Sequence, residues 1–451
     1  MQSEVLGHAA RRAIAYLQEI PARRVAPGES ALRGLEELGG PLPEEPCDPC
    51  AVVDLLDRAG SPATVATAGG RFFGFVNGAA VPASVGAAWL ASAWDQNAAL
   101  RVMSPVAAAL EDAALRWVRD LLGLPAECDA ALVTGATMAN FCGILAARHV
   151  LLERAGWDVE SEGLFGAPAI QVVAGAEVHI SLVKALGMAG LGRKRFVRAP
   201  VDGQGRMQVS GLPALDRRTI VCLQAGNVNT GAFDPAEEIC RRAHDAGAWV
   251  HVDGAFGQWA AASPQYRHLT AGFEKADSWA TDAHKWPNVG YDCGVALVRE
   301  AGALRAAMAI AAAYIAPGEL REPSQYTPEM SRRARGVELW AALRSMGRRG
   351  LAELIERTCG HAQRFAAGLR EAGYEILNDV AINQVLVSFG TPETTRAVIE
   401  RVQREGTCWC GVSEWQGRTA MRISVSSWAT TEEDVEVSLE AIRRVAGECR
   451  A

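Results

Sequence analysis

The chain has 451 residues, of which 49% are hydrophobic and 22% are charged, a balance typical of a soluble globular enzyme. Its net charge of −7, with both signs mixed along the chain, argues against nucleic acid or an anionic membrane surface as a main partner. The longest apolar run, Ala306 to Ala316, is too short to span a membrane. Charged residues interrupt the first 18 positions, so we expect no signal peptide and a cytoplasmic protein.

The cysteines are scattered, and their odd number, 11, predicts reduced and mostly buried thiols. Cys47 and Cys50 form a CxxC pair, but no second pair follows at the spacing of zinc ligands. We interpret them as loop thiols, with a metal or redox role as the alternative, and predict no metal site. Cys408 and Cys410 have the spacing of two residues on one face of a strand, which predicts core positions.

The first 60 residues are expected to form an N-terminal arm. An amphipathic helix is predicted over 4–20 and a second helix over 49–59, joined by a connector rich in Pro, Gly and Glu. This is too little for an independent hydrophobic core. A loop over 69–84 then carries aromatic residues among glycines, which indicates a pocket wall or a subunit contact, or alternatively a buried loop. Helices over 89–100 and 105–122 follow it.

From residue 130 the pattern alternates between strand and helix. Strands are predicted over 131–134, 170–175 and 219–226, each followed by a helix, over 135–154, 181–190 and 235–246. This order predicts an α/β fold with a mostly parallel central sheet covered on both faces, in a large domain over 61–312. Residues 313–451 are expected to form a loop, a connecting helix and a small C-terminal α/β domain. No Walker A motif and no dinucleotide fingerprint is present, which counts against ATP and NAD.

The most informative stretch runs from Val250 to Val298. It contains HVDGA, a buried strand that ends in Asp253, and then DAHKW, in which Lys285 lies between a histidine and a tryptophan. A buried carboxylate is costly unless it meets a cation, and a lysine in apolar surroundings becomes a usable amine nucleophile. An acid and a lysine together are what a pyridoxal phosphate (PLP) site requires. As separate residues, the first could be a strand cap and the second a surface lysine.

The two motifs resemble the PLP-dependent group II amino-acid decarboxylases, relatives of the aromatic amino-acid, glutamate and diaminobutyrate decarboxylases. The resemblance implies a fold-type-I homodimer in which the arm packs on the partner subunit. It implies that Lys285 holds PLP covalently, that Asp253 pairs with the ring nitrogen and that Ala255 leaves room for the ring. Asp282 and His284 are also implied as cofactor residues.

Residues that follow three of the predicted strands also fit this resemblance. Gly135, Ala136 and Thr137 open a helix whose N-terminal N–H groups could bind the PLP phosphate. The family usually has GGTEAN here, whereas this chain has GATMAN, without the second glycine and the acid. His179 follows a buried strand, where the family stacks a histidine on the PLP ring, although a lone histidine is more often structural. Asn227 could hydrogen-bond the ring oxygen or the phosphate.

The substrate side is less well defined. Tyr314, 29 positions after Lys285, matches a family tyrosine on a mobile loop that protonates the substrate carbon. Phe73, Phe75 and Asn77 match a stretch that lines the substrate pocket, and the phenylalanines favour an aromatic or large apolar amino acid. Arg422 is either a carboxylate ligand or a structural residue.

The predicted reaction is decarboxylation of an L-amino acid to its amine. Two alternatives are another PLP reaction on this fold, either aldol-type carbon–carbon cleavage or amine oxidation to an aldehyde. Family members with phenylalanine at the position of Tyr314 tend toward the aldehyde, so the tyrosine favours decarboxylation. The third alternative, a non-catalytic binding protein, conflicts with the intact Asp253, Lys285 and His179.

Overall fold

The computed structural model describes residues 2–310 and 320–450, and the chain divides into two compact units. The first unit comprises Met1–Ala79, His361–Leu377 and Val385–Ala451, and the second comprises Ala80–Gly360 and Asn378–Gln384. Each unit therefore contains segments that are far apart in the sequence. Within the described ranges, no helix is both long and apolar enough to cross a membrane.

The second unit is built on a seven-stranded sheet in the order β2-β8-β7-β6-β5-β3-β4. Its strands are β2 (Asp129–Val133), β3 (Gln171–Gly175), β4 (Val197–Ala199), β5 (Thr219–Gln224), β6 (Trp249–Asp253), β7 (Ser278–Asp282) and β8 (Gly294–Val298). Only β8 runs antiparallel to its neighbours β2 and β7. The predicted α/β class with a mostly parallel sheet is confirmed.

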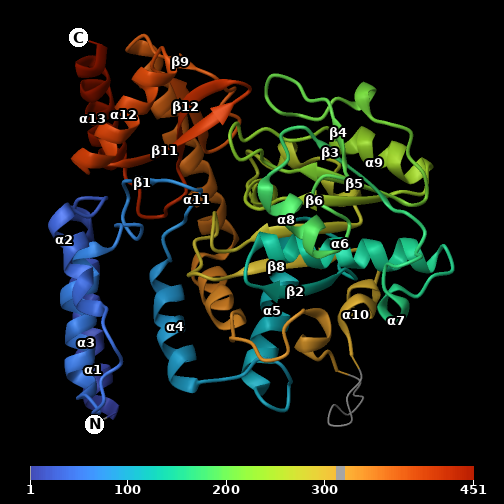
Figure 1. The fold of residues 1–451 in the computed structure, drawn as a ribbon, viewed down its shortest axis with the longest axis horizontal. Helices are drawn as coiled ribbons and strands as arrows, with labels where there is room; N and C mark the ends of the chain where they lie inside the picture. The colour runs from blue at the N-terminus through green and yellow to red at the C-terminus, as the bar shows by residue number, and fades with distance from the viewer. Residues whose placement is uncertain (1, 311–319, 451) are drawn as a thin grey trace. The chain divides into compact units, whose positions relative to one another are not determined.

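Helices surround this sheet, and α6 and α8 lie against it (Figure 1). The helices of the unit are α4 (Pro82–Trp94), α5 (Pro105–Leu121), α6 (Ala136–Glu153), α7 (Val159–Glu162), α8 (Ile180–Met188), α9 (Ala236–Asp245) and α10 (Ala303–Met308). Helices α6, α8 and α10 form a continuous hydrophobic core with the strands. The long helix α11 (Gly336–Glu371) begins in this unit, is interrupted at Gly347 and ends in the first unit.

Strand alternation decides which residues of β6 face helix α6. Successive side chains of a strand point to opposite faces, so Trp249, His251 and Asp253 share one face. Trp249 belongs to the core that α6 completes, and His251 and Asp253 both hydrogen-bond to Asn140 of α6. The strand thus places two polar side chains under a helix, where each needs a partner.

The first unit contains a five-stranded sheet in the order β1-β11-β12-β10-β9. Its elements are α1 (Gln2–Glu19), α2 (Glu29–Gly34), α3 (Pro49–Leu55), β1 (Phe72–Phe73), β9 (Glu375–Ile376), β10 (Gln384–Ser388), α12 (Pro392–Glu405), β11 (Trp409–Trp415), β12 (Arg418–Ser424) and α13 (Glu432–Arg450). Cys408 and Cys410 are fully buried, which confirms their core prediction.

The expected loop over 69–84 is partly wrong. Phe72 and Phe73 form strand β1, which pairs in parallel with β11, and helix α4 begins at Pro82 instead of residue 89. Proline at the first helical position is favourable because its fixed φ suits a helix start and its missing N–H is not needed there. The same helix ends at Trp94, because Asp95 adopts a left-handed conformation with φ 49°.

Candidate active site

The carboxyl ends of the parallel strands gather the predicted residues of the second unit. Asp253 ends β6, Asp282 ends β7, and the two strands are neighbours. The Asp282 N–H donates to the carbonyl oxygen of Ala255 at 2.9 Å, which ties the ends of both strands together. Ligands of open α/β sheets bind at this edge, so the site occupies the expected place.

Lys285 pairs with Asp282. The Nζ lies 3.0 Å from Oδ2 of the carboxylate, and the two side chains are only 19% and 3% exposed. The other carboxylate oxygen, Oδ1, accepts the N–H of Ala136 at 2.6 Å and lies 3.5 Å from Nε2 of His284. Asp282 therefore connects the lysine, the histidine beside it and the first turn of α6. At the sequence level, Asp282 was predicted as a site residue only through the family resemblance. Its hydrogen bond to the first turn of α6 was not predicted.

The turn that carries Lys285 is fixed by Trp286, known from the sequence only as part of the DAHKW motif, and by Asn288, which sequence reasoning did not single out. Trp286 is fully buried, and its indole N–H donates to Oγ1 of Thr358 at 2.9 Å. Asn288 adopts φ 58°, and its side-chain amide donates to the carbonyl oxygen of Trp286 at 2.5 Å. Asparagine tolerates this left-handed conformation better than most residues, and the Pro-Asn pair was the available sequence signal for the turn.

Asp253 is 5% exposed and is surrounded by neutral hydrogen-bond donors. Oδ2 accepts from Nδ2 of Asn140 at 3.0 Å and lies 3.4 Å from Oγ of Ser181, while Oδ1 accepts the N–H of Ala255 at 3.2 Å. In the described part of the chain, no lysine or arginine lies within 4.0 Å of this carboxylate. A carboxylate offers about four acceptor positions, so at least one remains for a further donor. A protonated pyridine nitrogen is such a donor and supplies the missing positive charge.

His179 caps the start of α8, and its neighbours define its tautomer. Nδ1 accepts the N–H of Ser181 at 3.2 Å and lies 2.7 Å from the Ser181 hydroxyl oxygen. That hydroxyl is closer to Nδ1 than to Asp253, so its single proton goes to the histidine. The proton of the neutral ring is therefore on Nε2.

His284 is also held as a neutral ring. Burial lowers its pKa, and Nδ1 accepts the N–H of Cys293 at 3.2 Å. The ring lies against that of Tyr291, with a centroid distance of 4.5 Å and an angle of 32° between the ring planes. These contacts hold the His284 ring in place next to Lys285 in the sequence.

The predicted phosphate turn is compact. An added Cβ at Gly135 would lie 3.1 Å from the His284 ring and 3.3 Å from Asp282, and one at Gly294 would lie 2.5 Å from the Gly135 backbone. Because the Ala136 N–H is committed to Asp282, the first-turn donors left to an anion are those of Thr137 and Met138. Asn227 is buried, and its Oδ1 accepts the N–H groups of residues 229 and 230, which holds the turn after β5.

The residues expected on the substrate side are found in the first unit or outside the described ranges. Phe73 is 1% exposed and packs edge-on against Phe365, whereas Phe75 is 60% exposed with φ 53°. Asn77 closes a turn through its N–H to the Gly74 carbonyl at 3.0 Å. Arg422 lies on β12, where burial lowers its pKa. Tyr314 lies outside the described residues.

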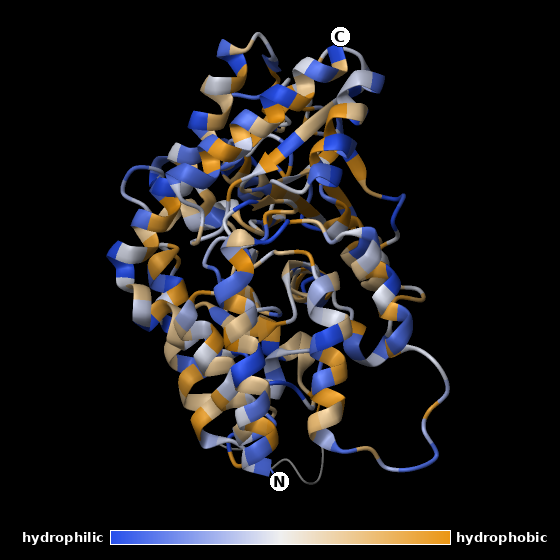
Figure 2. Ribbon diagram, turned by 90° about the vertical axis from the view of Figure 1, so that its left-hand side faces the viewer, coloured by the Kyte–Doolittle hydropathy of each residue, from blue (hydrophilic) through white to orange (hydrophobic). Residues whose placement is uncertain are grey.

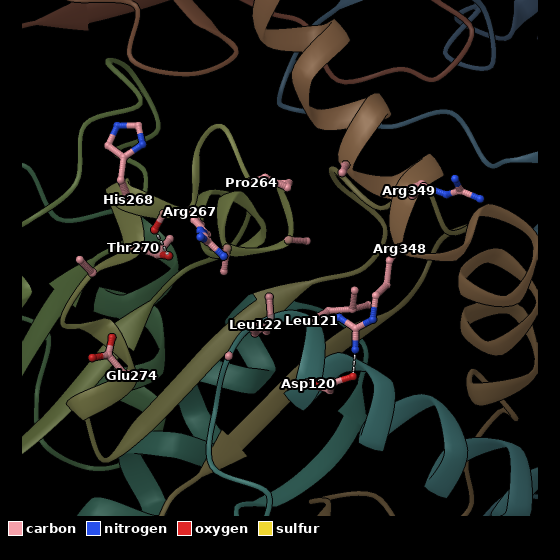
Figure 3. Close-up of a pocket in the computed structure, with 15 residues that line it drawn as sticks. Asp120, Leu121, Leu122, Pro264, Arg267, His268, Thr270, Glu274, Arg348 and Arg349 are labelled. Carbon is pink, nitrogen blue, oxygen red and sulfur yellow. Dashed lines mark hydrogen bonds and ion pairs between the residues drawn. The ribbon is translucent and has the colours of Figure 1, made fainter.

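A pocket elsewhere on the second unit is unrelated to this site (Figure 3). It has a volume of about 710 Å³ and is lined by charged residues such as Arg267, Glu274 and Arg348, the last paired with Asp120. Neither Lys285 nor any other predicted cofactor residue lines it. Its lining combines these charged residues with apolar ones such as Leu121 and Pro264.

The fold and the site together define a PLP-dependent enzyme of fold type I. A mostly parallel sheet brings a paired lysine, a helix N-terminus and a buried acid with a spare acceptor position to one edge, and these are the groups that PLP requires. Residues 63–391 match the family model described as the pyridoxal-dependent decarboxylase conserved domain. The chain belongs to this family and is a PLP-dependent amino-acid decarboxylase, a carboxy-lyase.

Known proteins resemble the chain over most of its length. An aromatic-L-amino-acid decarboxylase of Bacillus atrophaeus is 25% identical over 423 residues, 88% of this chain and 86% of the relative. A phenylacetaldehyde synthase of a Rosa hybrid cultivar is 29% identical over 312 residues, covering 64% and 59% of the two chains. The crystal structure of Oryza sativa TDC with PLP and tryptamine has a TM-score of 0.90 and 23% identity, covering 99% of this chain and 97% of that chain.

Proposed function

We propose that the protein decarboxylates an L-amino acid with an aromatic or large apolar side chain, releasing CO₂ and the corresponding amine. The observation that carries the proposal is the buried Asp253 carboxylate, which neutral donors surround and which has at least one acceptor position left for a cofactor. The likeness to an aromatic-L-amino-acid decarboxylase supports the substrate class.

When bound, PLP supplies an electron sink for the bond that breaks at the substrate α-carbon. Lys285 attaches the cofactor, and Asp282 beside it holds the ammonium group in position beforehand. Asp253 would keep the proton on the ring nitrogen, and His179 and Ala255 would help to hold the ring. The N–H groups of the first turn of α6, including that of Thr137, hold the phosphate.

We assign the protonation of the substrate carbon to Tyr314. Decarboxylation replaces a carboxylate on the α-carbon by a proton, so a group with an exchangeable proton must reach that carbon. Tyr314→Phe deletes the hydroxyl alone and should lower amine formation by about 10²–10⁴-fold, the range of a lost general acid, while CO₂ release declines less. The ratio of amine to CO₂ tests this. An unchanged ratio with an unchanged rate would contradict the role and transfer it to His179.

On the substrate side, Phe75, Asn77 and Arg422 are proposed to contact the amino acid. Phe75 is the exposed member of its segment, and its ring lies 5.3 Å from that of Trp409. Phe75→Ala should raise KM for aromatic substrates more than for small apolar ones. Phe73 is buried against Phe365, and we propose that this packing fixes the segment that carries Phe75 and Asn77. Arg422→Lys tests the carboxylate contact, because lysine cannot reproduce the two-pronged arginine hydrogen bonds.

A homodimer is part of the proposal. Helix α1 has no buried residue in the single chain, and Leu6, Ile14 and Leu17 on it are 41–56% exposed. Figure 2 shows hydrophobic (orange) and hydrophilic (blue) segments intermixed along the helix that begins at the N-terminus. Apolar side chains of this number are rarely left in water, which favours a second copy of the chain as their cover. Sedimentation of the full chain and of a version without residues 1–48 tests this, and an active monomer would contradict it.

We also propose a cytoplasmic location. All eleven cysteines are free, and most are buried. Unpaired thiols in this number suit a reducing compartment. Fractionation of cells that express the protein tests the proposal, and recovery outside the cytoplasm would overturn it.

The reaction is tested by incubating the PLP-loaded protein with each amino acid and measuring CO₂, amine, aldehyde and hydrogen peroxide. CO₂ and amine in equal amounts support the proposal. Aldehyde with peroxide would establish the second candidate, which the likeness to a phenylacetaldehyde synthase favours. Carbon–carbon cleavage without CO₂, or no reaction and no bound PLP, would overturn both candidates.

A further inference from the structure

Behind Asp253, a chain of hydrogen bonds continues into the core. Asn140 contacts Asp253 with Nδ2 at 3.0 Å and contacts Nε2 of His251 with Oδ1 at 2.8 Å. Nδ1 of His251 lies 2.8 Å from Oγ of Ser278, which accepts the indole N–H of Trp249 at 2.9 Å. All four residues beyond the aspartate are at most 2% exposed. Buried polar groups in a row are costly unless every one of them is satisfied.

The donors and acceptors of these hydrogen bonds can be assigned in only one consistent way. Asp253 is a carboxylate, so Asn140 must give it the amide N–H and present Oδ1 to His251. The Nε2 of His251 then carries the proton, and its Nδ1 accepts the hydroxyl proton of Ser278. The indole of Trp249 can only donate, and it donates to the remaining lone pair of Ser278.

Every N–H and O–H dipole of the row therefore points toward the carboxylate. The histidine is neutral, because burial lowers its pKa to about 3. Reversing any one bond would place two donors or two acceptors face to face.

Helix α6 leaves space for this row. Asn140 and Gly143 lie three positions apart and share a face of the helix. An added Cβ at Gly143 would lie 2.6 Å from Cε1 and 2.7 Å from Nδ1 of His251. Only glycine permits the imidazole to lie between the helix and Ser278. The fit of α6 on β6 thus depends on the same histidine that orients Asn140.

We propose that His251, acting through Asn140, is a positioning residue that holds Asp253 ionised and aimed at the ring nitrogen of PLP. The proposal rests on the PLP site described above. Aligned donors stabilise the anionic carboxylate, and only an anion can retain the proton on the ring nitrogen. Without the histidine donor, Asn140 loses the partner that fixes its amide, and Asp253 loses a directed N–H.

The test compares the affinity of the apoprotein for PLP with its affinity for 1-deaza-PLP, which has carbon in place of the ring nitrogen. The ratio of the two dissociation constants reports the Asp253–ring nitrogen contact and needs no turnover. His251→Phe, which keeps a ring but removes both nitrogens, should reduce the preference for PLP by about tenfold. His251→Gln, which can still donate to Asn140, should restore most of it.

A second variant and a matched control come from strand β7. Ser278→Ala removes the donor to Nδ1 and should reduce the same preference by about threefold. Thr281, on the opposite face of this strand, has a buried hydroxyl that finds no hydrogen-bond partner among the described residues. Thr281→Val therefore removes a buried hydroxyl outside the row and should leave the preference unchanged.

Distinct results separate the possible failures. Equal losses of affinity for both compounds in His251→Phe and Ser278→Ala would give the row a purely structural role and overturn the proposal. An undiminished preference for PLP in both variants would also overturn it, while leaving the cofactor site intact. A wild-type protein that binds both compounds equally would overturn the pairing of Asp253 with the ring nitrogen and the proposal with it.

Discussion

Two buried carboxylates of the second unit, Asp253 and Glu111, are treated in opposite ways. Glu111 on α5 is 2% exposed and is paired with two arginines, Arg332 and Arg321, the latter at 3.0 Å. Asp253 is 5% exposed and receives only neutral donors. A structural carboxylate is thus neutralised within the protein, whereas the carboxylate at the proposed cofactor site has no such counter-charge among the described residues.

The arginines around Glu111 also show what that site is for. Arg332 donates to the carbonyl oxygens of Ala98 and Leu132, and Arg321 donates to that of Ala130. The cluster satisfies backbone groups along strand β2 and joins them to helix α5. Its charges are fully used, so it offers nothing to a substrate. An uncompensated buried charge is therefore the better indicator of a functional site here.

The largest effect should follow from removing the free charge. Asp253→Asn leaves the ring nitrogen of PLP without its counter-ion, so we expect CO₂ release to fall by about 10³-fold, as when one preorganised electrostatic contact is lost. Glu111→Gln, measured as folded protein at low temperature, serves as the control and should retain most activity. Equal losses in the two variants would remove the distinction between the carboxylates.

The converse change should affect stability. Glu111→Gln leaves Arg332 buried without its counter-charge, and we expect the free energy of unfolding to fall by about 3–5 kcal/mol. Urea unfolding of the apoprotein measures it. A loss below about 1 kcal/mol would mean that water, not Glu111, solvates the arginine.

The neutral row behind Asp253 predicts a dependence of stability on pH. His251 has a pKa of about 3 in the folded protein, below the usual 6.5, because burial disfavours its charged form. As the pH falls, His251 therefore takes up a proton in the unfolded chain before it does so in the folded protein. The contribution of neutral His251 to the free energy of unfolding is complete above pH 6.5 and is lost as the pH falls toward 3. Between pH 6 and 4, wild type should lose about 1.4 kcal/mol per pH unit more than His251→Gln. Parallel pH profiles of the two proteins would show that His251 is charged in the fold.

The smallest effect should come from the outer arginine of the cluster. Arg321 is 21% exposed. When Arg321 is removed, Glu111 still forms its ion pair with Arg332. Arg321→Ala should destabilise the protein by about 1 kcal/mol, well below the effect of Glu111→Gln. Urea unfolding of both variants in one series provides the comparison, and equal effects would show that the two arginines are equivalent.

Much of the second unit could be predicted from the sequence because its signals are local. The apolar strand that ends at Asp253 and the motif around Lys285 can each be recognised from a few consecutive residues. The alternation of strands and helices along the sequence predicted the mostly parallel sheet. The link from Asp282 to the Ala136 N–H joins residues 146 positions apart, and no local pattern encodes it. The same holds for Asn140 and His251, which a helix and a strand bring together.

The first unit was harder to predict for the same reason. Strand β1 exists only because Phe72 and Phe73 pair with Trp409 and Cys410, more than three hundred positions along the chain. A two-residue strand has no periodicity of its own, so the segment reads as a loop. Helix α4 was placed too late because its small residues, from Pro82 onward, carry little amphipathic signal.

The central claim, that Asp253 is a buried charge kept for the cofactor, is tested most directly by unfolding the apo and PLP-loaded forms of wild type and Asp253→Asn in urea. Removing the charge relieves its burial and costs one hydrogen bond, so the apo forms should differ by no more than about 1 kcal/mol. PLP should stabilise wild type far more than the variant, because the stability that a bound ligand adds grows with the logarithm of its affinity. A variant whose apo form loses about 3 kcal/mol, yet gains as much from PLP as wild type does, would show that Asp253 is a structural residue like Glu111.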